Sequence, residues 1–128
     1  MDKKTNHQKI VSEFVEQLKP VLNDSEQSMY VYLDDHHKAC NQKFAELLGY
    51  SNARQWAEGK DSFTLAYVEP KSQKTLVTAY RNAMEKMTGS VNTVTWKKKS
   101  GGKVKTKVIL VPISFKGHLF ALHFISKT

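Results

Sequence analysis

Two apolar runs near the end of the sequence, residues 104–113 and 118–125, are joined by a tight turn at Lys116-Gly117. Successive side chains of a strand point to opposite faces of the sheet. An antiparallel sheet with one face in water shows apolar residues on one parity only, but the far halves of both runs are apolar on both parities. The pattern therefore predicts a β-hairpin in the middle of a sheet that is covered on both faces.

Alternation along each run also assigns faces to individual residues of this hairpin. We expect Leu110 and Phe120 on the face toward a long helix that precedes the hairpin in the sequence. We expect Ile109, Val111 and Ile125 on the opposite face, toward a helix at the start of the chain. His123 has the same parity as Ile109 and Val111, and we interpret it as a satisfied structural histidine; a response to pH is the alternative.

Residues 5–22 are predicted to form the first of these helices. Apolar residues recur at three- and four-residue intervals, among them Ile10, Phe14 and Leu18, and form one stripe. This stripe either caps the open face of its own sheet or pairs with the same stripe of another subunit, and both can hold at once.

The middle of the sequence predicts short strands and helices. Asn41 can cap a helix that carries Phe44 and Leu48, and a further short helix carries Trp56. A longer helix follows Pro70, with Leu76, Tyr80 and Met84 in its apolar stripe, and the next strand places Val94 and Trp96 on one face.

The length and composition of the chain predict one domain without a membrane-spanning segment. The chain has 128 residues, of which 40% are hydrophobic and 25% charged, and its apolar runs fall short of the about 18 residues that cross a bilayer. Cys40 is the single cysteine, so an internal disulfide is excluded. A lone cysteine fits a reducing compartment, and we expect a cytoplasmic protein.

The net charge of +8 is concentrated at one hairpin tip, where six lysines lie between Lys97 and Lys107. No aromatic residue interleaves with them, as stacking on a single-stranded nucleic acid would require. We interpret the Lys97–Lys107 hairpin as a solvated device that protects a sheet edge. A basic nucleic-acid-binding module is the alternative.

The order of the elements resembles the PAS domain family over about residues 29–125. Residues 30–34 (YVYLD) resemble the first strand of that family with its acidic turn, and residues 41–51 (NQKFAELLGYS) resemble its N-x-x-F…GY-S helix. Residues 69–72 (EPKS) stand at the entry to the long helix, and residues 96–102 (WKKKSGG) resemble the hairpin between the third and fourth strands.

The resemblance implies an α+β fold with a five-stranded antiparallel sheet of order 2-1-5-4-3. The helices would lie on one face, and an N-terminal amphipathic helix on the other face or at a dimer interface. Residues 1–28 would form this helix and a linker, and residues 29–128 the PAS-like domain. It further implies a non-catalytic sensory or signal-transduction module that acts as a homodimer or through a separate partner protein. No output domain follows Thr128, so we expect the output to be another chain, or the sequence to be part of a longer one.

PAS-like domains often hold a small ligand between the sheet and the helices. The residues expected to line such a pocket are Phe44, Leu48, Trp56, Leu76, Tyr80, Met84, Val94, Trp96, Leu110 and Phe120. The residues expected to form a dimer or partner face are Ile10, Phe14, Leu18, Ile109, Val111 and Ile125. Tyr80 and the Trp96 indole are the polar groups expected to meet a ligand. Ordinary core packing of the same residues is one alternative, and a small-molecule or cofactor receptor with a genuine cavity is another.

Several kinds of chemistry are disfavoured. Residues 70–88 contain no histidine for a haem, and Cys40 lies outside an Asn-Cys-Arg-like motif for a covalent flavin, so the cofactor stays unknown. Adjacent residues in a turn rarely converge on one ion, so we expect no metal at the run Asp34-Asp35-His36-His37. No paired carboxylates, phosphate loop or nucleophile-base pair indicates an enzyme.

Overall fold

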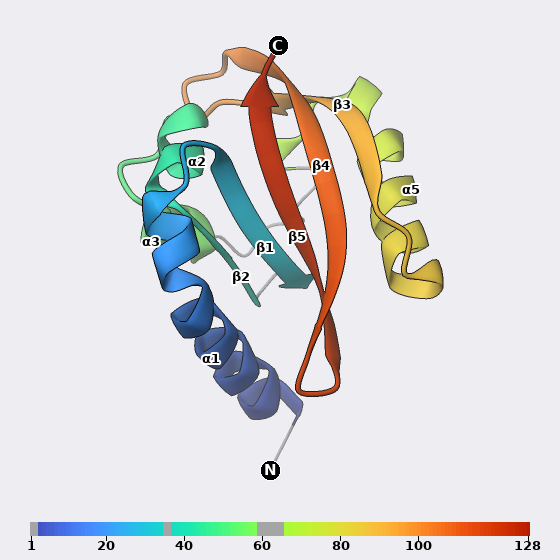
Figure 1. Cartoon of the computed structure of the whole chain (residues 1–128). Coiled ribbons are helices and arrows are strands. Elements are labelled where there is room, and N and C mark those ends of the chain that lie inside the picture. The colour runs from blue at the N-terminus through green and yellow to red at the C-terminus, as the bar shows by residue number, and fades with distance from the viewer. Residues whose placement is uncertain (1–2, 35–36, 59–65) are drawn as a thin grey trace.

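The computed structural model describes residues 3–34, 37–58 and 66–128 (Figure 1). Five strands form one antiparallel sheet in the order β2-β1-β5-β4-β3, which confirms the predicted α+β architecture and strand order. The strands are β1 (Ser28–Asp34), β2 (His37–Cys40), β3 (Ser90–Lys97), β4 (Lys103–Phe115) and β5 (His118–Lys127).

The helices are α1 (Lys3–Asp24), α2 (Gln42–Leu47), α3 (Ala53–Ala57) and α5 (Pro70–Lys86). We call the face that packs against α2, α3 and α5 the inner face, and the face that packs against α1 the outer face (Figure 1). Among the described helices, none is long and apolar enough to cross a membrane. Asp35 and His36, from the run considered for a metal, lie outside the described residues.

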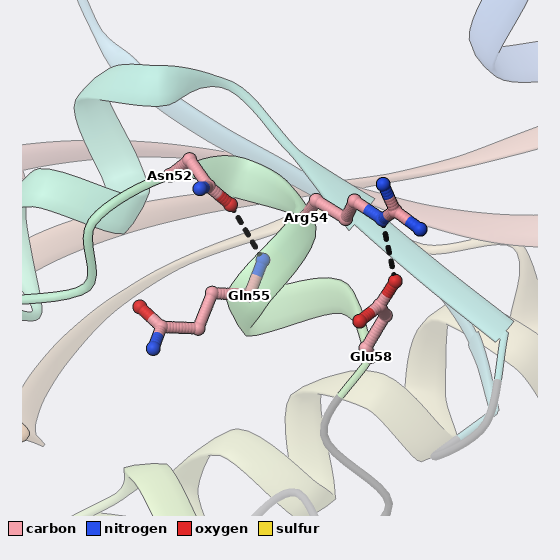
Figure 2. A network of polar contacts seen from close by, with 4 residues as sticks. All are labelled: Asn52, Arg54, Gln55 and Glu58. Atoms are coloured by element: carbon pink, nitrogen blue, oxygen red, sulfur yellow. Dashed lines mark hydrogen bonds and ion pairs between the residues drawn. The ribbon is translucent and has the colours of Figure 1, made fainter.

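The short helix α3 has a side-chain cap at its start and an exposed ion pair along its surface (Figure 2). The Asn52 side-chain oxygen accepts the Gln55 N–H at 2.8 Å, which satisfies one of the free donors of the first turn. Arg54 Nε donates to Glu58 Oε1 at 2.6 Å. A helix of this length is not stable alone, and its fully buried Trp56 packs it against the core.

The edge of the sheet at β3 is tied to the start of α5. The Ser72 hydroxyl accepts the Thr95 N–H at 2.9 Å, and the Glu69 N–H donates to the Thr95 carbonyl at 2.9 Å. Both backbone groups of Thr95 are therefore bonded to the first residues of the α5 segment, next to a β-bridge between Val68 and Trp96, which places α5 beside β3.

The register of the β4–β5 hairpin corrects two of the predicted faces. Lys116-Gly117 forms a two-residue turn with Phe115 opposite His118, so the even positions of β4 lie opposite the odd positions of β5. Ile125 consequently belongs to the inner core, and Phe120 packs on the outer face with α1. Both expectations were wrong because alternation relates residues within one strand, whereas the turn relates the two strands.

The same register moves His123 from the outer to the inner face. It lies opposite Leu110 on β4 and Tyr30 on β1, and both of these residues are buried on the inner side. The expectation that His123 shares a face with Ile109 and Val111 was wrong for the same reason.

The first helix caps its own sheet, but over only part of the outer face. Ile10, Phe14 and Leu18 pack with Met29 and other outer-face residues of β1 and β5, so the intramolecular alternative is observed. Val91, Ile109, Phe124 and Met29 form one row across β3, β4, β5 and β1. Along this row the exposed fraction falls from 64% at Val91 to 39% at Ile109 and 0% at Met29, with Phe124 half-buried.

Helix α1 therefore covers the outer face over β1 and β5 but not over β4. Val111 is 36% exposed. The expected contact of the first helix with Ile109 and Val111 is not formed, because α1 packs instead on the β1 side of the sheet and on the far end of the β4–β5 hairpin.

Candidate functional site

Four aromatic rings fill the inner core directly beneath the sheet. Tyr30 lies 4.8 Å from Phe44, 5.6 Å from Trp56 and 5.7 Å from Trp96, measured between ring centroids. The Phe44 ring is in addition 5.2 Å from Trp56 and 5.3 Å from Trp96. All four side chains are fully buried. These distances are typical of directly packed rings, so the four side chains occupy one another's space.

Most residues of the predicted pocket lie on the inner side, in two separate clusters. Phe44, Leu48, Trp56, Leu76, Val94 and Trp96 belong to the aromatic cluster, and Leu110, Tyr80 and Met84 pack around the small residues Ala79, Ala83 and Ala121 under α5. Phe120 is on the other face of the sheet. A ligand between these residues stays a prediction from the sequence.

The two polar groups expected to meet a ligand are used within the protein. The Trp96 indole Nε1–H donates to the Thr106 hydroxyl at 2.8 Å, and this hydroxyl donates to the Val94 carbonyl at 2.9 Å. The Tyr80 hydroxyl donates to the Leu33 carbonyl at 3.2 Å. Buried polar groups need such partners. The Trp96 and Tyr80 donors therefore stabilise the inner core, and their bonds are not evidence for a polar ligand site.

A lysine that the sequence analysis passed over lies beside this core. Lys38 on β2 is 4% exposed, with its Nζ 5.4 Å from the centroid of the Trp56 ring and 6.0 Å from that of Tyr67. A cation over aromatic faces is favourable, the more so when it is shielded from water. The sequence could have predicted that Lys38 points inward, because Lys38 and Cys40 share a face of a short strand.

Cys40 itself is a buried, unreactive thiol. Burial raises the pKa of Cys40 to about 12. Because the thiolate is the reactive form, a nucleophilic role for Cys40 is disfavoured.

His123 and Tyr30 form a stacked pair at the centre of the sheet. Their ring centroids are 3.8 Å apart with an interplanar angle of 12°, and His123 Nδ1 lies 3.1 Å from the Ala121 carbonyl oxygen, to which it donates. Burial lowers the pKa of His123 to about 3. The imidazole is therefore neutral at physiological pH, and its ring extends the aromatic core onto β5.

Asn41 is the junction between the inner and outer covers. Its side-chain oxygen accepts the N–H groups of Met29 and Phe44, both at 3.0 Å, and the second bond is the predicted cap of α2. Its amide group donates to the carbonyls of Leu22 at 3.2 Å and Gln27 at 2.9 Å. One buried side chain thus joins the last turn of α1, the start of β1 and the start of α2.

The opposite part of α1 is held by the tip of the β4–β5 hairpin. The Phe14 ring lies 5.1 Å from Phe115 and 4.6 Å from Phe120, measured between centroids. Lys116 in the turn forms an ion pair with Glu13, and the hydrogen bond from Lys116 lowers the pKa of Glu13. Besides the packing of its apolar stripe on β1 and β5, helix α1 is therefore held at Asn41 and at the hairpin tip.

Comparison with known proteins identifies the fold. No protein-family model matches the chain, and no curated protein matches it in sequence. Among solved structures, the PAS domain of a two-component sensor histidine kinase superposes with a TM-score of 0.67 at 12% identity, over 91% of this chain and 99% of that chain. The chain has the PAS fold.

Further PAS-fold structures are similar over most of the chain. The PAS domain of nitrogen regulation protein NR(II) from Vibrio parahaemolyticus has a TM-score of 0.63 at 18% identity, over 85% of this chain and 95% of that one. The LOV protein of Rhodobacter sphaeroides has a TM-score of 0.68 at 12% identity, over 91% and 67%. At these identities the likeness is one of fold.

Proposed function

We propose that this PAS-fold chain is a sensory or interaction module of signal transduction, working as a homodimer or through a separate partner protein. Residues 29–128 would be the sensing domain and residues 1–28 the helix and linker that respond to it. The outer face of the sheet, with α1 on it, would be the output surface. The PAS domains of a two-component sensor histidine kinase and of nitrogen regulation protein NR(II), which have the same fold, support this class of role.

One observation carries the proposal: β1 belongs to both covers at once. Tyr30 lies at the centre of the inner aromatic core, while its chain neighbours Met29 and Val31 pack against α1 on the outer face. Neighbouring side chains of a strand are joined by a stiff backbone. We therefore expect a shift of the Tyr30 ring to move Met29 and Val31, against which α1 packs.

Asn41 gives the same coupling a second route. It bonds α2, which supplies Phe44 to the aromatic core, and also the Leu22 carbonyl in the last turn of α1. A rearrangement at the start of α2 would move the amide that holds α1. Two routes that end on one helix favour α1 as the element that reports the state of the core.

Hydrogen exchange in α1 tests this proposal. We compare Tyr30→Leu, which opens the aromatic core under β1, with Leu76→Ala, which opens the inner core under α5; large-to-small changes of this kind destabilise by about 2–5 kcal/mol. We expect Tyr30→Leu to accelerate exchange in residues 10–22 more than in residues 76–86, and Leu76→Ala to do the reverse. Equal acceleration of both segments in both variants would contradict the proposal, because it would show uniform destabilisation without coupling.

The oligomeric state is measured alongside. Sedimentation equilibrium of the full chain distinguishes a homodimer from a monomer that works through another protein. A variant that loosens α1 and also changes the association constant would link the two events. Unchanged association in a variant with faster α1 exchange would assign the output to a separate partner.

A further inference from the structure

The entire net charge of the chain lies in its last three strands and their turns. Residues 90–128 contain eight lysines and no acidic residue. The remaining residues, 1–89, contain twelve basic and twelve acidic residues and balance to zero. The excess of positive charge is therefore a property of one side of the sheet, the side formed by β3, β4 and β5.

Part of this charge borders the apolar surface that α1 leaves open. We call this surface the β3–β4 strip; it consists of Val91, Ile109, Val111, Lys105 and Lys107. Strand β4 carries Lys105, Lys107, Ile109 and Val111 at alternate positions, so all four share the outer face. In Figure 1, α1 lies on the β1–β2 side of the sheet, away from β3.

The lysines of the strip have no acidic partner among the described side chains. Within the described part of the chain, neither Lys105 nor Lys107 forms an ion pair, whereas Lys103 reaches Glu69 at 3.6 Å. The apolar residues beside them are 36–64% exposed at Val91, Ile109 and Val111. An apolar row with a border of one charge sign indicates a surface that is complementary to a partner with the opposite sign.

We propose that the β3–β4 strip binds an acidic amphipathic segment of a separate protein. Apolar side chains of that segment would pack on Ile109 and Val111, and its carboxylates would lie over Lys105 and Lys107. Such a helix would lie beside α1 on the same sheet, in the manner of an amphipathic helix on an apolar surface. This inference rests on the proposed function, for which it supplies the partner class.

Three other occupants fit the surface less well. A second copy that met the strip with its own strands β3–β5, which contain lysines and no acids, would bring like charges together in a two-fold contact. A flat bilayer would be held away by α1, which stands on the same face with a diameter of about 10 Å. A nucleic acid would use the lysines but would leave Ile109 and Val111 without a role.

The test uses the full chain and two fluorescein-labelled helical peptides. Both have leucine at positions i, i+3, i+4 and i+7, one with glutamate at every exposed position and the other with lysine there. We expect anisotropy titrations to show that the glutamate peptide binds at least about tenfold more tightly. The paired change Lys105→Glu and Lys107→Glu should remove this preference, and Ile109→Asp should weaken binding by about tenfold or more.

A matched control separates the strip from the overall charge. The paired change Lys71→Glu and Lys74→Glu lowers the net charge by the same amount, but these exposed lysines lie on α5. We expect this variant to bind the glutamate peptide like the unchanged chain. Equal loss in both paired variants would overturn the proposal, because binding would then follow net charge alone.

Other results assign the strip to a different occupant and also overturn the proposal. Binding to phosphatidylserine-containing vesicles that is lost with Lys105 and Lys107, without peptide binding, would indicate a membrane. Self-association that is lost in Ile109→Asp would indicate a second copy.

The two proposals can fail separately. If the peptide binds but hydrogen exchange in α1 does not become faster in Tyr30→Leu, the proposed function fails and the assignment of the strip stands. If the exchange responds but neither peptide binds, this inference alone fails.

Discussion

The two covers of the sheet differ in how they are held. Within the described residues, the inner cover consists of α2, α3 and α5, whose side chains interlock with the sheet, with aromatic rings in contact and the Trp96 and Tyr80 donors bonded inside the chain. The outer cover is one described helix whose apolar stripe packs on β1 and β5, with further contacts at Asn41 and at the hairpin tip. The same strands therefore carry several helices on one face and a single helix on the other, and we expect the single helix to detach more easily.

This difference has a thermodynamic meaning. Proteins open in local units whose free energies range from near zero to that of global unfolding. A single helix with few attachments belongs to the low end of this range, and an interlocked core belongs to the high end. The comparison predicts that α1 detaches while the sheet and its inner helices stay folded.

The largest expected effect is the difference in the free energy of unfolding between Phe44→Ala and Phe14→Ala. Both rings are buried, Phe44 in the inner core and Phe14 under α1. We expect Phe44→Ala to lower the free energy of unfolding by about 3–5 kcal/mol, and Phe14→Ala to lower it by less because α1 can detach alone. Urea denaturation followed by circular dichroism measures both values. Equal losses would show that the two covers unfold together.

Acid should weaken the inner side of the sheet through His123. Burial lowers its pKa to about 3, against an ordinary value of 6.5, so below pH 6.5 the unfolded chain takes up a proton that the folded chain does not. As far as His123 is concerned, the free energy of unfolding is therefore highest above pH 6.5 and decreases as the pH falls from 6.5 toward 3. At about 1.4 kcal/mol per pH unit, the loss between pH 6.5 and 5 is about 2 kcal/mol.

The matched variant for this pH dependence is His123→Phe, which keeps a ring against Tyr30 but cannot titrate. Urea denaturation at several pH values measures the slope of stability between pH 5 and 6.5. We expect the slope to be much smaller in His123→Phe than in the unchanged chain. An equal slope in both proteins would assign the acid sensitivity to other groups.

Asn41→Ala should loosen both covers at their junction. It removes a helix cap and leaves the Leu22 and Gln27 carbonyls without their donor, at a cost of about 1–2 kcal/mol. Hydrogen exchange should become faster in the last turn of α1 as well as in α2. Asn52→Ala removes a comparable cap from α3 and should leave α1 unchanged. Slow exchange in α1 of Asn41→Ala would show that Asn41 caps α2 without holding α1.

The smallest expected effect concerns the ion pair of Glu13 with Lys116 at the hairpin tip. Because the Lys116 side chain is mostly exposed and that of Glu13 is partly exposed, Glu13→Gln should change global stability less than any variant above. It should slightly increase hydrogen exchange in α1 at low salt, and this difference should vanish at high salt. Glu58→Gln breaks the exposed pair with Arg54 on α3 and should not affect α1. An increase that persists at high salt would point to lost packing rather than lost charge.

Part of what the sequence analysis missed was present in the sequence. A two-residue turn at Lys116-Gly117 requires Phe115 to face His118, so the inner position of Ile125 and the outer position of Phe120 follow from the predicted turn. The error was to treat the two runs separately. The inner position of the Lys38 side chain could likewise be predicted, because Lys38 and Cys40 are two residues apart on one strand and so share a face.

The sequence alone determined the α+β class, the order of the elements, the strand order through the PAS resemblance, and the burial of Phe44, Trp56 and Trp96. These features follow from local periodicity and local motifs, which each segment carries by itself. Only the tertiary structure decided where α1 lies, that it leaves Ile109 and Val111 exposed, and that Asn41 bonds Leu22. Contacts between segments far apart in the chain depend on how whole surfaces fit, and no periodicity within one segment encodes that fit.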